Sequence, residues 1–247
     1  MKSINWFHYA APQTFYGFAG RVWPWLAVLA TALMLAGLWL GFAVAPADFQ
    51  QGEGYRIIFV HVPVSWMSMV VYLAMAFWSV LGLTFNTRLS GMMTRALAPT
   101  GALFAFLSLW TGALWGKPMW GTWWVWDARL TSELILFFLY LGYIALTSAI
   151  DDTRRSDRAG ALIAIVGAVN VPIIYFSVKW WNTLHQGASV SLTKGSSMAE
   201  VMLWGMLLMA LAFWFYTLAL VLYRVRTLIL QRESHATWVH ELDEVKP

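Results

Sequence analysis

Four tryptophans, a carboxylate and a guanidinium fall within one short segment of the chain. The segment reads Trp120-Gly121-Thr122-Trp123-Trp124-Val125-Trp126-Asp127-Ala128-Arg129. Indole rings offer flat apolar faces to a ligand, and the charged groups that follow can anchor its polar edge. An aromatic belt at a membrane surface is the alternative explanation. Because belts are spread over several helices, the consecutive indoles favour a ligand-binding surface formed by Trp120, Trp123, Trp124 and Trp126.

Two of the five histidines are placed to ligate a metal on the same side of the protein. His61 lies two residues before Pro63, where we expect it to be the N-terminal cap of a helix. The helix dipole there disfavours the imidazolium and keeps a ring nitrogen available to a metal. His185 follows Trp180-Trp181-Asn182 in a second loop. Two imidazoles beside a broad aromatic surface match haem, a planar apolar macrocycle whose iron takes axial ligands.

Charged residues near the tryptophans complete the predicted site. Arg56 precedes His61 and Arg129 ends the tryptophan run, so both are placed to bind haem propionates through charge-assisted hydrogen bonds. The alternative for Arg129 is an ion pair with Asp127 or with lipid headgroups. We expect Asp127 to orient a ligand rather than bind iron, because such sites favour histidine. Glu133 could have the same orienting role or could be a charge near a helix N-terminus.

The chain contains no cysteine, which excludes several kinds of site. It cannot ligate a metal through thiolate, form a disulfide or attach haem through a C-x-x-C-H motif. Any haem is therefore expected to be haem b, held non-covalently. The sequence also has no P-loop, dinucleotide glycine fingerprint or G-x-S-x-G motif, so nucleotide hydrolysis and serine chemistry lack their residues. We predict haem handling and transfer rather than an enzyme.

The composition is that of an integral membrane protein. Hydrophobic residues make up 60% of the chain and charged residues 11%, against roughly 25% charged in soluble proteins. Crossing a hydrocarbon core takes roughly 20 apolar residues. The sequence predicts an all-α bundle of six transmembrane helices in a single membrane domain, with spans at about 22–44, 62–83, 97–115, 131–150, 159–178 and 201–223. The tryptophan segment, 116–131, joins the third span to the fourth, and 224–247 form a polar tail.

Lysine and arginine predict the orientation in the membrane, because short cytoplasmic loops carry the excess of these residues. One side of the predicted bundle carries Lys2, Arg21, Arg88, Arg95, Arg154, Arg155, Arg158, Arg224, Arg226 and Arg232. Both termini are therefore expected to be cytoplasmic, with the tryptophan segment and the two histidines facing outward. These cations form no dense basic stripe, so we predict no nucleic-acid partner despite a pI near 9.4.

The tryptophan segment also resembles a known signature. The run Trp115-Gly116-Lys117-Pro118-Met119-Trp120-Gly121-Thr122-Trp123-Trp124-Val125-Trp126-Asp127-Ala128-Arg129-Leu130-Thr131 is similar to the WWD signature of haem-handling proteins. Its setting resembles the CcmC family of bacterial cytochrome c maturation. The likeness covers nearly the whole chain, including the six spans, His61 before the second span and His185 within Trp180-Trp181-Asn182-Thr183-Leu184-His185-Gln186-Gly187. Larger relatives of the CcmF and CcsA type have more spans than this length can hold.

The resemblance implies a haem-delivery protein in the bacterial inner membrane. Such a protein would hold haem at its periplasmic face and present it to the chaperone CcmE, which then carries the haem covalently. The ABC-type subunits CcmA and CcmB and the small membrane protein CcmD are the other implied partners. His61 and His185 are the implied axial ligands, and the WWD surface consists of Trp120, Trp123, Trp124, Trp126 and Asp127. The sequence leaves open whether both histidines ligate iron at once.

Two other classes of function stay open at the level of the residues. A membrane cytochrome b subunit would also use paired histidines. To carry electrons across the bilayer, however, they should face one another inside helices, and His61 and His185 lie at the ends of spans. A secondary transporter would need charges or broken helices near the membrane midplane, and the spans show almost none.

Overall fold

The computed structural model of the chain describes residues 10–181, 183, 185 and 198–244. Over these ranges the secondary structure is helical, without a β-strand. The elements are α1 (Pro12–Trp39), the π-helical turn η2 (Leu40–Val44), the 3-10 turn η3 (Glu53–Ile57), α2 (Ile58–Phe85), α3 (Arg88–Trp120), α4 (Ala128–Ala149), α5 (Thr153–Gly167), α6 (Asn170–Trp180), α7 (Glu200–Arg232) and α8 (Thr237–Glu244).

Six helical segments are long and apolar enough to cross a membrane, which confirms the predicted fold class. They run over Pro12–Val44, Glu53–Phe85, Arg88–Trp120, Ala128–Ala149, Thr153–Trp180 and Glu200–Arg232. Most are longer than the apolar stretches that predict them, because polar and aromatic residues at their ends continue the same helix. The chain is therefore a multi-pass membrane protein.

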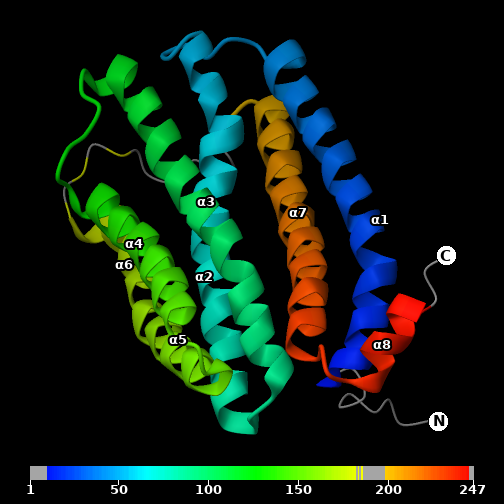
Figure 1. The fold of residues 1–247 in the computed structure, drawn as a ribbon. Helices are drawn as coiled ribbons and strands as arrows, with labels where there is room; N and C mark the ends of the chain where they lie inside the picture. Colours follow the sequence, from blue (N-terminus) through cyan, green and yellow to red (C-terminus); the bar gives the residue numbers. More distant parts are fainter. Residues whose placement is uncertain (1–9, 182, 184, 186–197, 245–247) are drawn as a thin grey trace, which may run out of the picture.

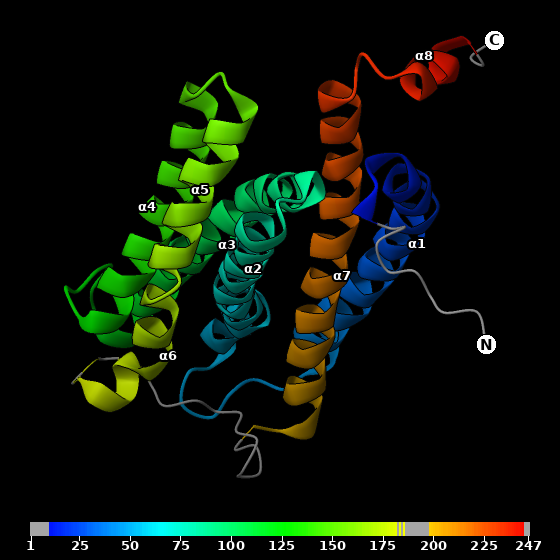
Figure 2. The same cartoon turned by 90° about the horizontal axis from the view of Figure 1, so that it is seen from below.

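The order of the helices in space differs from their order in the chain. The last span, α7, lies between α1 and the pair α2–α3, while α4, α5 and α6 pack on the other side of that pair (Figures 1 and 2). Small residues allow this close packing. The fully buried ring of Phe59 in α2 fits against Gly205 of α7, where an added Cβ would lie 3.0 Å from the ring. The α2–α3 pair is thus the centre of the bundle.

Local signals in the sequence set the ends of the helices around the tryptophan segment. Helix α3 ends at Gly121, whose φ of 77° is the left-handed conformation that glycine adopts without strain. Helix α4 begins directly after its N-terminal cap Asp127, whose Oδ1 accepts a hydrogen bond from the Leu130 N–H at 2.8 Å. The non-helical part of the segment is therefore a short connection fixed at both ends.

The fifth span is broken, whereas a single apolar stretch over 159–178 predicted one continuous helix. Helix α5 ends at Gly167 and α6 starts at Asn170. The Asn170 side chain is buried and donates from Nδ2 to the Ser132 carbonyl of α4 at 2.8 Å. Because a buried amide must find a partner in the membrane, this bond fixes α6 to the start of α4. Asn170 therefore has a structural role.

The polar tail is partly helical. Helix α7 continues to Arg232, and α8 lies beside the start of α1 (Figure 1). The rings of Trp238 and Tyr16 are 5.7 Å apart, and Val239 is buried. The apolar face of α8 explains why this segment packs on the bundle.

Candidate functional site

Residues from four parts of the chain line a small cavity near the start of α2. Its volume is about 20 Å³, and its walls come from α2, α3, α4 and the segment after α6. The lining residues are His61, Ser65, Ser108, Leu109, Arg129, Leu130, Glu133 and His185. The structure therefore brings together both histidines and one of the two arginines that the sequence singles out. We call this space the histidine cavity.

His61 lies in the first turn of α2 and is not its N-terminal cap. The sequence-based prediction of a cap was wrong, because the 3-10 turn Glu53–Ile57 runs directly into α2 and places Ile57 at the cap position. Pro63 consequently lies inside the helix rather than at its first position. His61 is thus held by a regular helix rather than by a loop.

A single hydroxyl fixes the imidazole of His61. Its Nδ1 lies 2.9 Å from Oγ1 of Thr111 in α3, and that hydroxyl donates its one proton to the Leu107 carbonyl at 2.5 Å. The Thr111 oxygen therefore accepts from Nδ1–H of His61. This arrangement leaves Nε2 with a free lone pair, the form of histidine that binds metals.

The carboxylate of Asp127 lies beside the imidazole of His185. The His185 Nδ1 is 3.4 Å from Oδ2 of Asp127, while Oδ1 of the same carboxylate caps α4. The side chains are 17% and 9% exposed, respectively. Burial lowers the pKa of His185 below its usual 6.5, although the Asp127 charge opposes this shift. A neutral ring with Nδ1–H toward the carboxylate again leaves Nε2 free.

Indole rings pack against both histidines. The Trp115 ring lies 5.6 Å from that of His61 in an edge-on contact, and the Trp120 ring lies 5.2 Å from that of His185. Trp124 and Trp126 contact each other edge-on at 5.3 Å. Trp123 and Trp126 are exposed, at 55% and 78%. The tryptophan segment thus has an inner part that supports the imidazoles and an outer part that faces the surroundings.

Arg129 and Glu133 lie one turn apart on α4 and both line the histidine cavity. Arg129 donates from Nη1 to the Ile174 carbonyl of α6 at 3.0 Å, and no carboxylate forms an ion pair with it among the residues that the structure describes. Glu133 is 5% exposed and accepts a hydrogen bond from Ser68 at 2.8 Å. Glu133 is therefore a buried acceptor that joins α4 to α2.

Arg56 does not line the histidine cavity. Its guanidinium pairs with Glu53 and donates to the Gly41 carbonyl at the end of the first span. It also lies over the Tyr55 ring, 5.5 Å from the centroid. These contacts tie η3 to η2, so the structure gives Arg56 partners that Arg129 lacks.

Two residues of the site were missed by sequence reasoning. Thr111 lies 50 positions from His61, and only the packing of α3 on α2 brings them together. Trp115 belongs to the WWD-like run, but its contact with His61 follows from the same packing. Gly112, next to Thr111, is the kind of small residue that such a contact requires, because an added Cβ would lie 3.0 Å from Cε1 of His61. A small residue beside a threonine is, however, common in membrane helices.

The donors of this site fit haem, but the cavity is too small for the macrocycle. Imidazoles are typical axial ligands of haem iron, indole faces suit a flat macrocycle, and a guanidinium that forms no ion pair among the described residues suits a propionate. A volume of about 20 Å³ accommodates a water molecule but no macrocycle. Binding of haem would therefore require this cavity to widen.

Comparisons with known proteins give a uniform result. The family model described as CcmC, "Heme exporter protein C", matches residues 5–240. "Heme exporter protein C" of Escherichia coli K12 is 46% identical over 234 residues, which cover 94% of each chain. The protein of the same name from Haemophilus influenzae is 48% identical over 96% of this chain and 97% of its own. A "Putative cytochrome c biosynthesis ccmC-like mitochondrial protein" of Marchantia polymorpha is 47% identical over 82% of this chain and 87% of its own.

Proposed function

Since the chain belongs to the CcmC family of heme exporter protein C, we propose that it holds haem b non-covalently between His61 and His185 and passes it to the chaperone CcmE. The role in haem handling for cytochrome c maturation follows from the family. The site and the route of delivery are our proposal.

One observation carries the assignment of the site. Two histidines from distant parts of the chain line the same cavity; Nδ1 of His61 lies within hydrogen-bond distance of the Thr111 hydroxyl, and Nδ1 of His185 lies 3.4 Å from Oδ2 of Asp127. Acceptors beside Nδ1 can fix the tautomer and orientation of a ligating histidine. A histidine that only packs in a membrane interior would have no need for this arrangement at both positions. The matched environments support axial ligation from both sides.

The surrounding residues support the same ligand. Trp115 and Trp120 would hold the imidazoles in place, and Trp123, Trp124 and Trp126 would offer apolar surface to the macrocycle. Arg129 would bind a propionate, because its guanidinium lines the cavity, forms no ion pair among the described residues and keeps donors beyond the one bonded to the Ile174 carbonyl. For Arg56, the other arginine predicted to bind a propionate, the contacts with Glu53 and Gly41 favour a structural role instead.

The partners and the orientation are part of the proposal. The family name places such proteins in a haem exporter system, and we propose CcmA, CcmB and CcmD as subunits of the same complex. The positive-inside rule supports an orientation in which both termini lie on the cytoplasmic side of a bacterial inner membrane. The chain would act as one membrane domain, with its histidine cavity at the periplasmic end of the bundle, where CcmE would receive haem.

A transfer experiment tests this function. The full chain, purified in detergent and loaded with haem, is mixed with apo-CcmE, and the two proteins are separated. We expect haem to leave the chain faster in the presence of CcmE and to appear on the chaperone, as followed by absorbance of each fraction.

Two controls make the result decisive. Serum albumin replaces CcmE in the first, to measure passive loss of haem. In the second, a quinol is added to the loaded protein. Loss at the same rate to albumin and to CcmE would contradict delivery. Retention of the haem with rapid reduction by the quinol would instead indicate an electron-transfer subunit.

Replacing Arg129 by glutamine should weaken haem binding about tenfold or more, since a charge-assisted hydrogen bond contributes roughly 1.5–3 kcal/mol. The iron ligands are untouched, so the wavelength of the Soret band should stay the same. Titration of the purified variant with haem measures the change.

The dimethyl ester of mesohaem is the control ligand, because it lacks free carboxylates. Arg129→Gln should leave the affinity for this ester unchanged. Arg56→Gln is the matched protein control, and we expect it to change the binding of haem and ester equally, because Arg56 contacts Glu53 and Gly41. An equal loss of both ligands in Arg129→Gln would assign Arg129 to the fold rather than to a propionate.

A further inference from the structure

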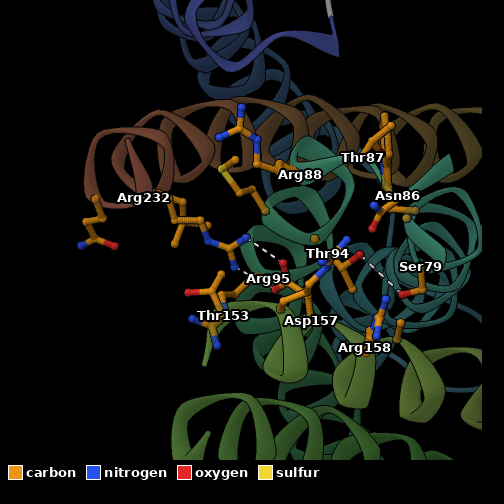
Figure 3. Close-up of a pocket in the computed structure, with 18 of the residues that line it drawn as sticks. Ser79, Asn86, Thr87, Arg88, Thr94, Arg95, Thr153, Asp157, Arg158 and Arg232 are labelled. Carbon is orange, nitrogen blue, oxygen red and sulfur yellow. Dashed lines mark hydrogen bonds and ion pairs between the residues drawn. The ribbon is translucent and has the colours of Figure 1, made fainter. Parts of the chain in front are cut away.

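A second cavity, far larger than the first, lies at the opposite end of α2. Its volume is about 990 Å³, and it is bounded by the α2–α3 turn, the start of α5 and the end of α7. Five arginines line it: Arg88, Arg95, Arg154, Arg158 and Arg232. We call it the arginine cavity (Figure 3). The two acidic residues of its lining are Asp157 and Glu233.

Three of these arginines have partners within the fold. Arg232 forms a two-pronged ion pair with Asp157 at 2.7 and 2.8 Å, marked by dashed lines in Figure 3. Arg88 pairs with Glu233 at 2.6 Å, and Arg95 donates to the Ser156 hydroxyl at 2.9 Å. The ion pair of Arg232 connects α7 to α5 and so fixes the shape of the cavity. Both acidic side chains of the lining are therefore already in ion pairs with arginines.

The other two arginines, Arg154 and Arg158, have no hydrogen-bond or ion-pair partner among the described residues. Both lie on the first two turns of α5, which begins at Thr153. Both side chains are exposed, so they are accessible to a ligand that enters the cavity. The lining holds five arginines against two carboxylates, and both carboxylates are already paired, so the cavity has an excess of positive charge that an anion would offset.

The remaining lining indicates what kind of anion fits. Apolar side chains, among them Trp78, Leu83 and Leu228, share the cavity with the arginines. The cavity lies where four of the membrane-spanning helices end or begin, so in a bilayer it would lie near the lipid headgroups. A lipid presents a phosphate to arginines and its glycerol and first methylene groups to apolar residues. A soluble phosphate compound would not need the apolar part.

From this lining we propose that the arginine cavity binds the phosphate group of an anionic phospholipid from the adjacent leaflet. Basic pockets between membrane helices bind anionic headgroups by this chemistry. The positive-inside rule alone requires cations on this side but not their convergence on one cavity. Arg155, next to Arg154 on the same turn, does not line the cavity, and so provides a matched control.

The test uses the full chain in nanodiscs of phosphatidylcholine mixed with phosphatidylglycerol, followed by native mass spectrometry of the lipids that stay bound. We expect the wild-type protein to retain phosphatidylglycerol over phosphatidylcholine by about tenfold or more. The double variant Arg154→Gln/Arg158→Gln should lose this preference, and Arg155→Gln should keep it. In pure phosphatidylcholine neither variant should melt below the wild-type protein, because the two cavity arginines have no partner to lose.

Competition with glycerol phosphate and inorganic phosphate separates the two sources of the phosphate group. Neither should displace the bound lipid at equal concentration. Displacement by them would overturn the assignment to a lipid, as would equal retention of both lipids by the wild-type protein. Loss of a protein partner by the double variant, with lipid retention unchanged, would overturn it in favour of a protein-docking site.

Discussion

The double variant His61→Ala/His185→Ala should lose axial ligation of haem altogether, and each single variant should lose one ligand. The reason is that these side chains are the two imidazoles of the histidine cavity and each has Nε2 free. Absorption spectra of the purified proteins, oxidised and reduced, measure the effect as a shifted Soret band and a lower haem content. We expect the double variant to show no bis-histidine spectrum at any haem concentration.

The matched control for this result is His240→Ala, because His240 is an exposed residue of α8 far from the cavity. It should leave the spectrum unchanged. Melting curves without haem check that the cavity variants still fold. A wild-type spectrum in the double variant would rule out ligation by this pair, whereas a change in only one of the single variants would show that a single histidine ligates the iron.

The number and type of the membrane helices could be predicted because hydropathy depends on neighbouring residues only. The break between α5 and α6 could not, since Asn170 lies in an apolar stretch and its effect depends on the Ser132 carbonyl of a different helix. The start of α2 was misplaced for a related reason. Pro63 favours the first turn of a helix, but the helix had already begun at the 3-10 turn before it.

The site shows the same division between local and distant information. Residue type and spacing pointed to His61, His185, Asp127 and Arg129, and the structure places all four within one region. From the sequence, Arg56 and Arg129 were predicted to have the same role, because both are cations near the predicted ligands. Only the folded chain distinguishes them: Glu53 neutralises Arg56, while Arg129 has no counter-charge in an ion pair within the described part of the chain.

Asp127→Asn should weaken haem binding about 10–100-fold, the range typical when a ligating histidine loses the acceptor that orients it. Oδ1 of Asp127 accepts from the Leu130 N–H, so an asparagine that keeps this cap must place its NH₂ group where Oδ2 now faces His185. The amide would then donate to Nδ1 of His185, which moves the ring proton to Nε2. A protonated Nε2 cannot ligate iron. Haem titration of the purified variant measures the loss, and its spectrum should match that of His185→Ala.

Asp152→Asn separates this effect from the loss of a helix cap. Asp152 caps α5 as Asp127 caps α4, with its Oδ1 accepting from the Arg155 N–H at 2.7 Å, but it contacts no histidine among the described residues. Asparagine caps helices about as well as aspartate, so both variants should melt close to the wild-type protein. Only Asp127→Asn should lose haem, because only there does the second carboxylate oxygen face an imidazole. Equal haem binding by the two variants would show that Asp127 acts only as a helix cap and does not set the tautomer of His185.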